Sequence, residues 1–321
     1  MRRRSQGPRT AAQMLICLCV CCGPVVARAA DGLPPVNDDQ EVVAHRVFKV
    51  SPFSELPRDQ LSHPLVPALR IAYEAADRIG RTVQDYTCRL VMRERVRGQL
   101  NPHHYSLVKV RRERRNETGV VTPLSIYLRF LSPSRVQGRE VLYVAGQNRG
   151  EMLARNGGVG NLQDVTLSMK PNSERAMRGR HYPVTEIGMQ NIVLRLIEVG
   201  LESMQIDRQR RECKVRFIDN AKIEGRLCRC IQVTFPERRE NLKFHLARIF
   251  IDEELRLPVR FAAYSWPLEP GKSPRLLEEY TFLDLKVNVG LTDTDFDRNN
   301  PAYKFYRPPR HEDRQAELSN P

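Results

Sequence analysis

The sequence lacks the short motifs that mark the common catalytic sites. It has no Gly-x-Ser-x-Gly nucleophile motif, no glycine-rich loop to hold a phosphate, and no His-Glu-x-x-His pair to hold a metal. Histidine is scarce as well, with 7 residues in a chain of 321. A hydrolase or a nucleotide-dependent enzyme therefore has no support, and we predict a protein that is not an enzyme and uses no cofactor or metal.

An apolar run long enough to span a bilayer comfortably is also missing. Residues 1–9 contain four arginines and no acid, residues 11–26 are almost wholly apolar, and Ala27-Arg28-Ala29 follows. This is the layout of a cleavable export signal, with cleavage expected after Ala29. No cysteine in the apolar run follows the pattern of a lipidated cysteine. We therefore expect an exported protein of the periplasm or cell envelope, soluble after signal cleavage.

Acidic residues are in the minority, and the excess of base lies in the folded part. The chain has a net charge of +14, and residues 1–29 hold five arginines and no acid, which leaves 14 − 5 = +9. Outside the cytoplasm such a surface meets little nucleic acid. It would instead face an anionic membrane surface, an acidic polymer or an acidic partner, or simply stay solvated.

No internal repeat and no Ser/Gly linker divides the chain, so a single folded domain is expected. Residues 30–64 are rich in proline and acid and predict an extended lead-in after the signal peptide of residues 1–29. Residues 306–321 have the composition of a disordered tail. The domain is therefore expected over residues 65–305.

The hydrophobic pattern predicts an α+β fold. A three-and-four spacing over 65–83 indicates an amphipathic helix, and Thr185 is expected to cap a more apolar, buried helix over 186–204. An alternating pattern predicts strands joined by short links over 86–92, 105–114, 124–130, 140–145, 151–155, 214–218, 227–235, 244–252, 258–265 and 276–289. Such a sheet must curl. We predict a large, curled, half-barrel-like antiparallel sheet that encloses the buried helix, with the amphipathic helix packed on it.

Two groups of polar residues invite a functional interpretation. His181 precedes the buried helix, and an enzyme that uses His181 or Glu186 is a minor alternative to a structural role. Asp293, Asp295, Asp297 and Asn299 alternate as in a calcium loop, but Arg298 and Lys304 replace the glycine and the bidentate glutamate of that motif. A solvated turn is the prediction for this segment.

Arginines crowd one predicted hairpin. Arg89, Arg93 and Arg95 alternate away from the apolar face of their strand, and Arg111 and Arg112 lie on its neighbour. They are candidates for contact with an anionic surface. The alternative is that charges on an edge hairpin prevent association between sheets.

The cysteines that follow the signal are not expected to pair. In the hairpin of residues 213–235, matching the apolar faces sets Phe217 opposite Ile231, with residues 223–225 as the loop. Cys213 then faces away from Cys228 and Cys230, too far for a disulfide.

Several segments resemble one family, a domain of unknown function numbered 1571 and found in planctomycete-type bacteria. The segments are Gly138-Arg139-Glu140-Val141-Leu142-Tyr143-Val144, Gly150-Glu151-Met152-Leu153-Ala154-Arg155, Arg180-His181-Tyr182-Pro183-Val184-Thr185-Glu186-Ile187-Gly188 and Asn300-Pro301-Ala302-Tyr303-Lys304-Phe305. The resemblance implies an envelope protein and no catalytic residue. More distantly, the order of elements is similar to that of the periplasmic lipoprotein carriers, which implies a half-barrel that shelters acyl chains.

The preferred hypothesis is a non-catalytic module that binds a lipid, an acylated protein or another apolar ligand in the concave sheet. The candidate lining residues are Leu90, Met92, Ile126, Leu128, Phe130, Ile192 and Leu196. The alternative is a structural or signalling envelope protein that binds its partners through the arginine-rich hairpin.

Overall fold

The computed structural model describes residue 48 and residues 50–157, 165–209 and 212–305. The predicted signal peptide and tail therefore lie outside the described residues, as does most of the predicted lead-in. Within the described part of the lead-in, two short 3-10 helices span Phe53–Glu55 and Arg58–Gln60. None of the helices in the described ranges is long and apolar enough to cross a membrane.

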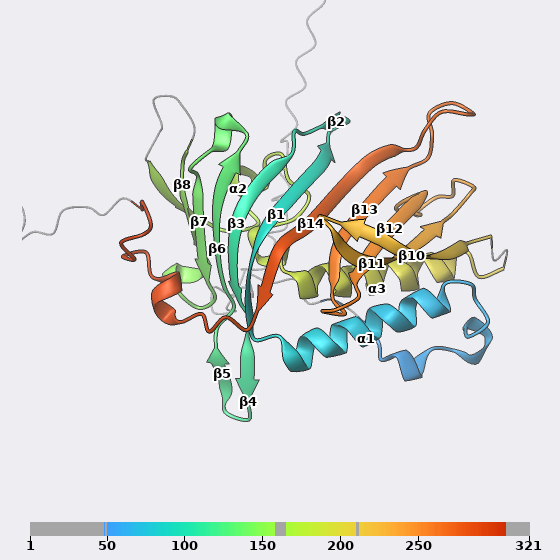
Figure 1. Cartoon of the computed structure of the whole chain (residues 1–321), viewed down its shortest axis with the longest axis horizontal. Helices are drawn as coiled ribbons and strands as arrows, with labels where there is room; N and C mark the ends of the chain where they lie inside the picture. Colours follow the sequence, from blue (N-terminus) through green and yellow to red (C-terminus); the bar gives the residue numbers. More distant parts are fainter. Residues whose placement is uncertain (1–47, 49, 158–164, 210–211, 306–321) are drawn as a thin grey trace, which may run out of the picture. The chain divides into compact units, whose positions relative to one another are not determined.

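One curled antiparallel sheet forms the body of the described chain (Figure 1). Its path is β10-β11-β12-β13-β14-β1-β3-β6-β7-β8-β9, with β2 paired to β1, and β4 and β5 form a separate small hairpin. The strands are β1 Asp85–Val96, β2 Gln99–Leu100, β3 His104–Arg111, β4 Arg114–Asn116, β5 Gly119–Thr122, β6 Ser125–Ser132, β7 Glu140–Val144, β8 Met152–Arg155, β9 Thr166–Met169, β10 Lys214–Ile223, β11 Arg226–Thr234, β12 Leu246–Asp252, β13 Pro258–Ser265 and β14 Arg275–Val287. The sheet does not close, which confirms the predicted half-barrel.

Two long helices lie side by side along the β10–β14 half of the sheet (Figure 1). They are α1, Val66–Thr82, and α3, Met189–Ile206, while α2 is a single turn at Glu174–Met177. The expected bounds of α1 are confirmed within a residue. The expected cap of α3 is wrong, because Gly188 is its N-cap and the Met189 amide donates to the Tyr86 hydroxyl at 3.0 Å. Thr185 lies instead in a short 3-10 helix, Val184–Glu186.

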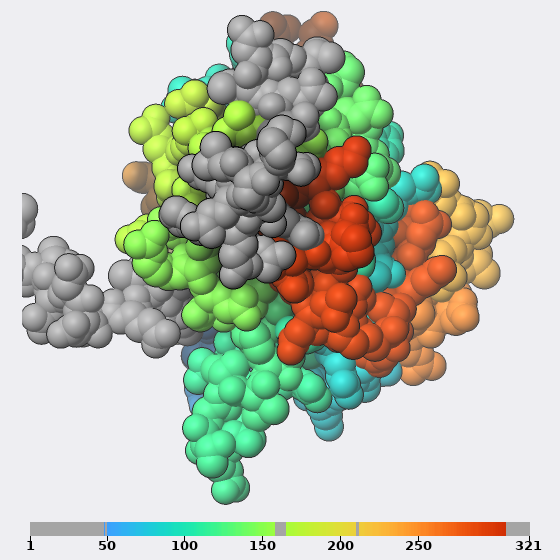
Figure 2. Space-filling view, turned by 90° about the vertical axis from the view of Figure 1, so that its left-hand side faces the viewer, coloured from blue at the N-terminus to red at the C-terminus, as the bar shows by residue number. Residues whose placement is uncertain are grey.

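Alternation along the strands divides the apolar residues between two layers. On β1 the concave-facing side chains Tyr86, Cys88, Leu90 and Met92 are all buried in the main core. A second, smaller cluster lies on the convex side of β6 and β7, where it is covered by the segment after β14; it comprises Tyr127, Leu142, Val144, Phe296, Tyr303 and Phe305. Figure 2 shows that segment in red against the green strands, and the β4–β5 hairpin as a projection below them.

The β10–β11 hairpin has the predicted register near its open end, with Phe217 opposite Ile231. Its turn differs from the expected three-residue loop. A bulge between Ile218 and Ala221 absorbs one residue, so that Glu224 and Gly225, both with positive φ, form a two-residue turn. Cys88, Cys213, Cys228 and Cys230 are all buried and unpaired.

Candidate functional site

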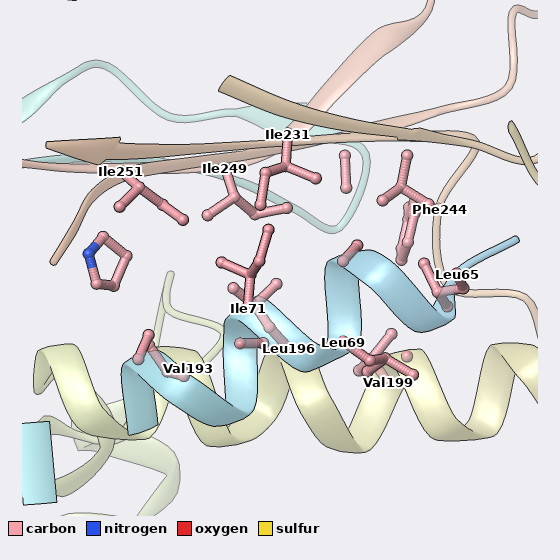
Figure 3. A pocket seen from close by; sticks show the side chains of 17 residues that line it. Leu65, Leu69, Ile71, Val193, Leu196, Val199, Ile231, Phe244, Ile249 and Ile251 are labelled. Carbon is pink, nitrogen blue, oxygen red and sulfur yellow. The ribbon is translucent and has the colours of Figure 1, made fainter. Parts of the chain in front are cut away.

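An apolar cleft lies where α1 and α3 meet the concave face of β11–β13 (Figure 3). In the figure the strands lie above, and side chains from both helices point toward them. The lining consists of Leu65, Ala68, Leu69, Ile71, Ala72, Ala75, Val193, Leu196, Val199, Gly200, Ile231, Val233, Phe244, Ala247, Ile249, Ile251 and Pro258. None of these residues has a polar or titratable side chain, so the cleft can offer only dispersion contacts and shelter from water.

The cleft is narrow but not sealed. Its free volume is about 70 Å³, roughly half that of an engineered apolar cavity that takes up benzene. Six of its wall residues nevertheless remain partly exposed, and they come from both helices and from β12: Ile71, Ala72, Leu196, Val199, Ile249 and Ile251. A ligand larger than a few carbon atoms therefore requires α1 to shift away from the sheet.

The start of α1 is held by a buried carboxylate at the end of α3. Asp207 is 1% exposed, and its oxygens accept from the backbone amides of Glu212 and Cys213. They also lie 3.1 Å from Arg239 Nη1 and 3.3 Å from Nε2 of His63, which is two residues before the N-cap of α1. This one carboxylate thus joins four segments around the end of the cleft.

The end of α1 is held by Arg112, one of the arginines that the sequence offers as candidates for contact with an anionic surface. Nη1 of Arg112 donates to the carbonyl oxygens of Ile79, Gly80 and Val83 at 2.6 to 3.2 Å, which satisfies acceptors left open at the helix C-terminus. Its Nε donates to Gln190 at the start of α3. Contact between Arg112 and an external anion stays a prediction, in which only its Nη2 is left to reach the anion, because Nε and Nη1 donate to the two helices.

The other hairpin arginines also have partners within the described chain. Arg89 lies 3.3 Å from Asp284, and Arg111 lies 2.6 Å from Asp293. Arg93 donates to the carbonyl of Asn101, and Arg95 donates to those of Leu276 and Gly98. Contact between this hairpin and an anionic surface stays a prediction, and the side chains that would make it are only partly exposed.

The seven ligand-binding residues predicted from the sequence separate into three groups. Leu196 lines the cleft. Leu128 and Phe130 line a different cavity on the β6–β9 half of the sheet. The remainder, Leu90, Met92, Ile126 and Ile192, lie in the main core and line neither of these cavities.

Most of the cleft wall was not singled out from the sequence. The helical spacing predicts that the α1 residues are buried, and the strand alternation predicts the same for Ile249 and Ile251. Neither pattern distinguishes the wall of an open cleft from a closed core. The useful signal was the apolar alternation of Ala247, Ile249 and Ile251 along β12, in which Ala247 lies opposite Val233 and Ile249 lies opposite Ile231.

His181 belongs to a polar network with Glu94 on β1 and Glu278 on β14, which lie opposite each other in the sheet. Its Nδ1 lies 2.7 Å from Glu278, its Nε2 lies 3.0 Å from the carbonyl of Arg95, and its amide donates to Glu94. Both ring nitrogens are therefore engaged within the fold. Glu186 forms an ion pair with Arg195 at 2.6 Å, so both residues of the enzyme alternative have structural partners.

We predict a pH dependence of stability from this network. The hydrogen bond to the Glu278 carboxylate raises the pKa of His181, although burial opposes it. The charged form is thus favoured in the folded state, so its contribution is complete below the unfolded pKa of about 6.5 and is lost as the pH rises through the folded pKa. Urea unfolding across pH should show the largest gap between the wild type and His181→Gln on the acid side. A gap that widens toward alkaline pH would contradict the assignment.

The alternating acids do not form a cation site among the described residues. Asp293–Phe296 form a 3-10 turn closed by a capping box between Thr292 and Asp295. Asp295 also lies 2.7 Å from Nζ of Lys109 on β3. The described ranges contain no group of three or more metal-ligating side chains.

Comparison with known proteins identifies the family. No protein of curated function matches the chain. Solved structures to which it is similar include Pseudomonas aeruginosa MucB in its complex with MucA (14% identity, 72% of this chain and 60% of that chain, TM-score 0.39). Others are a putative outer membrane lipoprotein-sorting protein domain from Vibrio parahaemolyticus (13%, 72% and 96%, 0.32) and the lipoprotein LppX from Mycobacterium tuberculosis (12%, 70% and 98%, 0.34). A family model described as a protein of unknown function (DUF1571) matches residues 83–305, most of the chain, and the chain therefore belongs to that family.

Proposed function

We propose that this is an exported, non-catalytic protein that binds the acyl chain of a lipid or an acylated protein in the cleft between α1, α3 and β11–β13. The observation that carries the proposal is the wall itself, which is wholly apolar and yet partly open to solvent. Ligand pockets are typically apolar with few polar groups, and this wall has the same character. Export is proposed on the pattern of residues 1–29.

The helix α1 serves as the cover of the site in this proposal. Its two ends are fastened by polar contacts, at His63 and Asp207 before the helix and at Arg112 after it. Its middle, from Leu69 to Ala75, meets the cleft with apolar side chains only, while the Tyr73 hydroxyl of this stretch donates to the Ser51 carbonyl on the side away from the cleft lining. Apolar contacts with a ligand can replace such contacts at little cost, because they have no directional requirement. We therefore expect the middle of α1 to move outward when a chain enters.

Filling the cleft should abolish binding. In Ala72→Phe the new ring occupies the space beneath α1, and we expect affinity for a fluorescent palmitate to fall about tenfold or more. Ala76→Phe is the matched control, because Ala76 lies one turn further along the same helix and does not line the cleft. Fluorescence titration of both variants gives the comparison, with melting curves to verify folding. Equal affinities for Ala72→Phe and the wild type would refute the proposed location.

A further inference from the structure

A second and larger cavity lies on the other half of the concave face. It has a volume of about 480 Å³, within the range of small-molecule sites, and it is bounded by β6–β9, the start of β3 and the segment 171–187. No residue lines both this cavity and the cleft under α1. The two can therefore be altered separately.

The lining of this cavity has two chemically distinct parts. The sheet supplies an apolar floor of Leu128, Phe130, Val141, Met152, Ala154, Leu167 and Met169. The walls carry five arginines, namely Arg135, Arg139, Arg175, Arg178 and Arg180, and among the described residues no aspartate or glutamate lines the cavity. A wall of guanidinium groups beside an apolar floor matches a molecule that is anionic at one end and apolar at the other.

The positive charges in this cavity are poorly compensated. Burial, together with the charges of Arg180 and Arg135, lowers the pKa of Arg139, and no described atom accepts a hydrogen bond from the buried Arg139 Nε. Burial and the charges of Arg180 and Arg139 lower the pKa of His104 to about 4, so this histidine stays neutral. A bound anion would relieve the mutual repulsion of these groups.

Arg180 is only weakly paired despite being mostly buried. Its Nη1 lies 4.0 Å from Glu94, which already accepts from the Tyr280 hydroxyl at 2.5 Å and from the His181 amide at 3.1 Å. Its guanidinium lies over the ring of Phe130, 5.3 Å from the centroid, at the junction of the floor and the charged wall. Arg180 therefore lines the cavity with a charge that Glu94 offsets only weakly, and its guanidinium is available to the anionic end of a ligand.

The backbone next to Arg139 is fixed by a close approach as well. A Cβ atom on Gly157 would lie 2.1 Å from the Arg139 nitrogen, so a side chain at that position would displace the segment that carries Arg139. Only glycine fits there.

We propose that this cavity binds an anionic amphiphile through a phosphomonoester headgroup held by Arg139 and Arg180, with the adjoining apolar chain on the Leu128 and Phe130 floor. Several converging guanidinium groups suit a doubly charged phosphate better than a singly charged carboxylate. The site differs from the cleft under α1 in chemistry as well as in place. It would give the protein selectivity for a headgroup, which the apolar cleft cannot provide.

Calorimetric titration of the purified protein with dihexanoyl phosphatidic acid tests this site. The proposal expects binding about tenfold or more tighter than that of dihexanoyl phosphatidylcholine, which has the same chains and no net charge. Inorganic phosphate should bind more weakly than the lipid, because it makes no use of the floor. Phosphate binding as tight as that of phosphatidic acid would overturn the amphiphile and indicate a free phosphate site. Equal binding of the two lipids, or no binding at all, would overturn the headgroup site.

Single substitutions locate the binding. Arg139→Gln should weaken phosphatidic acid binding about tenfold or more while leaving the melting temperature equal or higher, since it removes a repelled charge that has no acceptor. Arg216→Gln on the exposed face of β10 is the control and should change neither quantity. Ala72→Phe should leave this binding intact, which separates it from the α1 cleft. Unchanged binding in Arg139→Gln would contradict the proposal.

Discussion

Replacing Asp207 by alanine is expected to reduce the free energy of unfolding by about 3–5 kcal/mol, because it leaves buried partners without their shared carboxylate. Arg239, 18% exposed, would lose the Asp207 ion pair, and the amides of Glu212 and Cys213 would lose their acceptor. The same change releases His63 and with it the start of α1. Urea unfolding followed by circular dichroism gives the difference.

Asp219→Ala is the matched control for this prediction. Asp219 pairs with Arg229 at 2.9 Å, but both side chains are more than half exposed. Such a surface pair contributes only about 0–1 kcal/mol. A loss in Asp207→Ala as small as that in Asp219→Ala would show that the anchor of α1 lies elsewhere.

Leu90→Ala should cost about 2–5 kcal/mol of unfolding free energy, whereas Leu196→Ala should cost much less. Leu90 is 0% exposed on the central strand β1, so truncation leaves an enclosed cavity. Leu196 borders an existing opening, where water or a neighbouring side chain can occupy the space. Chemical denaturation of the two variants measures the contrast.

The reverse result has a definite meaning. A small loss at Leu90 would indicate that the centre of the concave face is accessible, and the binding site would then extend across β1 as the hydrophobic pattern alone suggested. A large loss at Leu196 would indicate that the cleft under α1 is a packed core.

Much of the fold could be predicted from the spacing of apolar residues along the sequence, because tertiary contacts did not override that spacing. Alternation on β1 predicted its buried face, and the three-and-four spacing predicted α1. The predicted start of α3 was wrong because the first amide of the helix donates to the hydroxyl of Tyr86, which is far away in sequence. Thr185 was therefore not needed as a cap. The predicted length of the β10–β11 turn was wrong because a bulge shortens the loop without changing the pairing of the apolar residues.

The site was harder to predict because the wall of an open cleft and a closed core are built from the same apolar residues. Leu90 and Leu196 are equally apolar and equally periodic, and they differ only in what the rest of the chain places above them. The same limit applies to the arginines, whose roles cannot be predicted from their charge and local sequence alone. Arg112 in a basic hairpin caps a helix, while Arg139 and Arg180, within segments of the family resemblance, line one cavity that no local pattern signals.

Photo-crosslinking tests the binding of an acyl chain under α1 most directly. A diazirine-labelled palmitate is bound to the purified protein, irradiated, and mapped by peptide mass spectrometry. The proposal predicts labels on residues 65–75 of α1 and on β11–β13, with loss of these labels in Ala72→Phe but not in Ala76→Phe. Labels confined to the convex face of the sheet, or an unchanged pattern in Ala72→Phe, would contradict it.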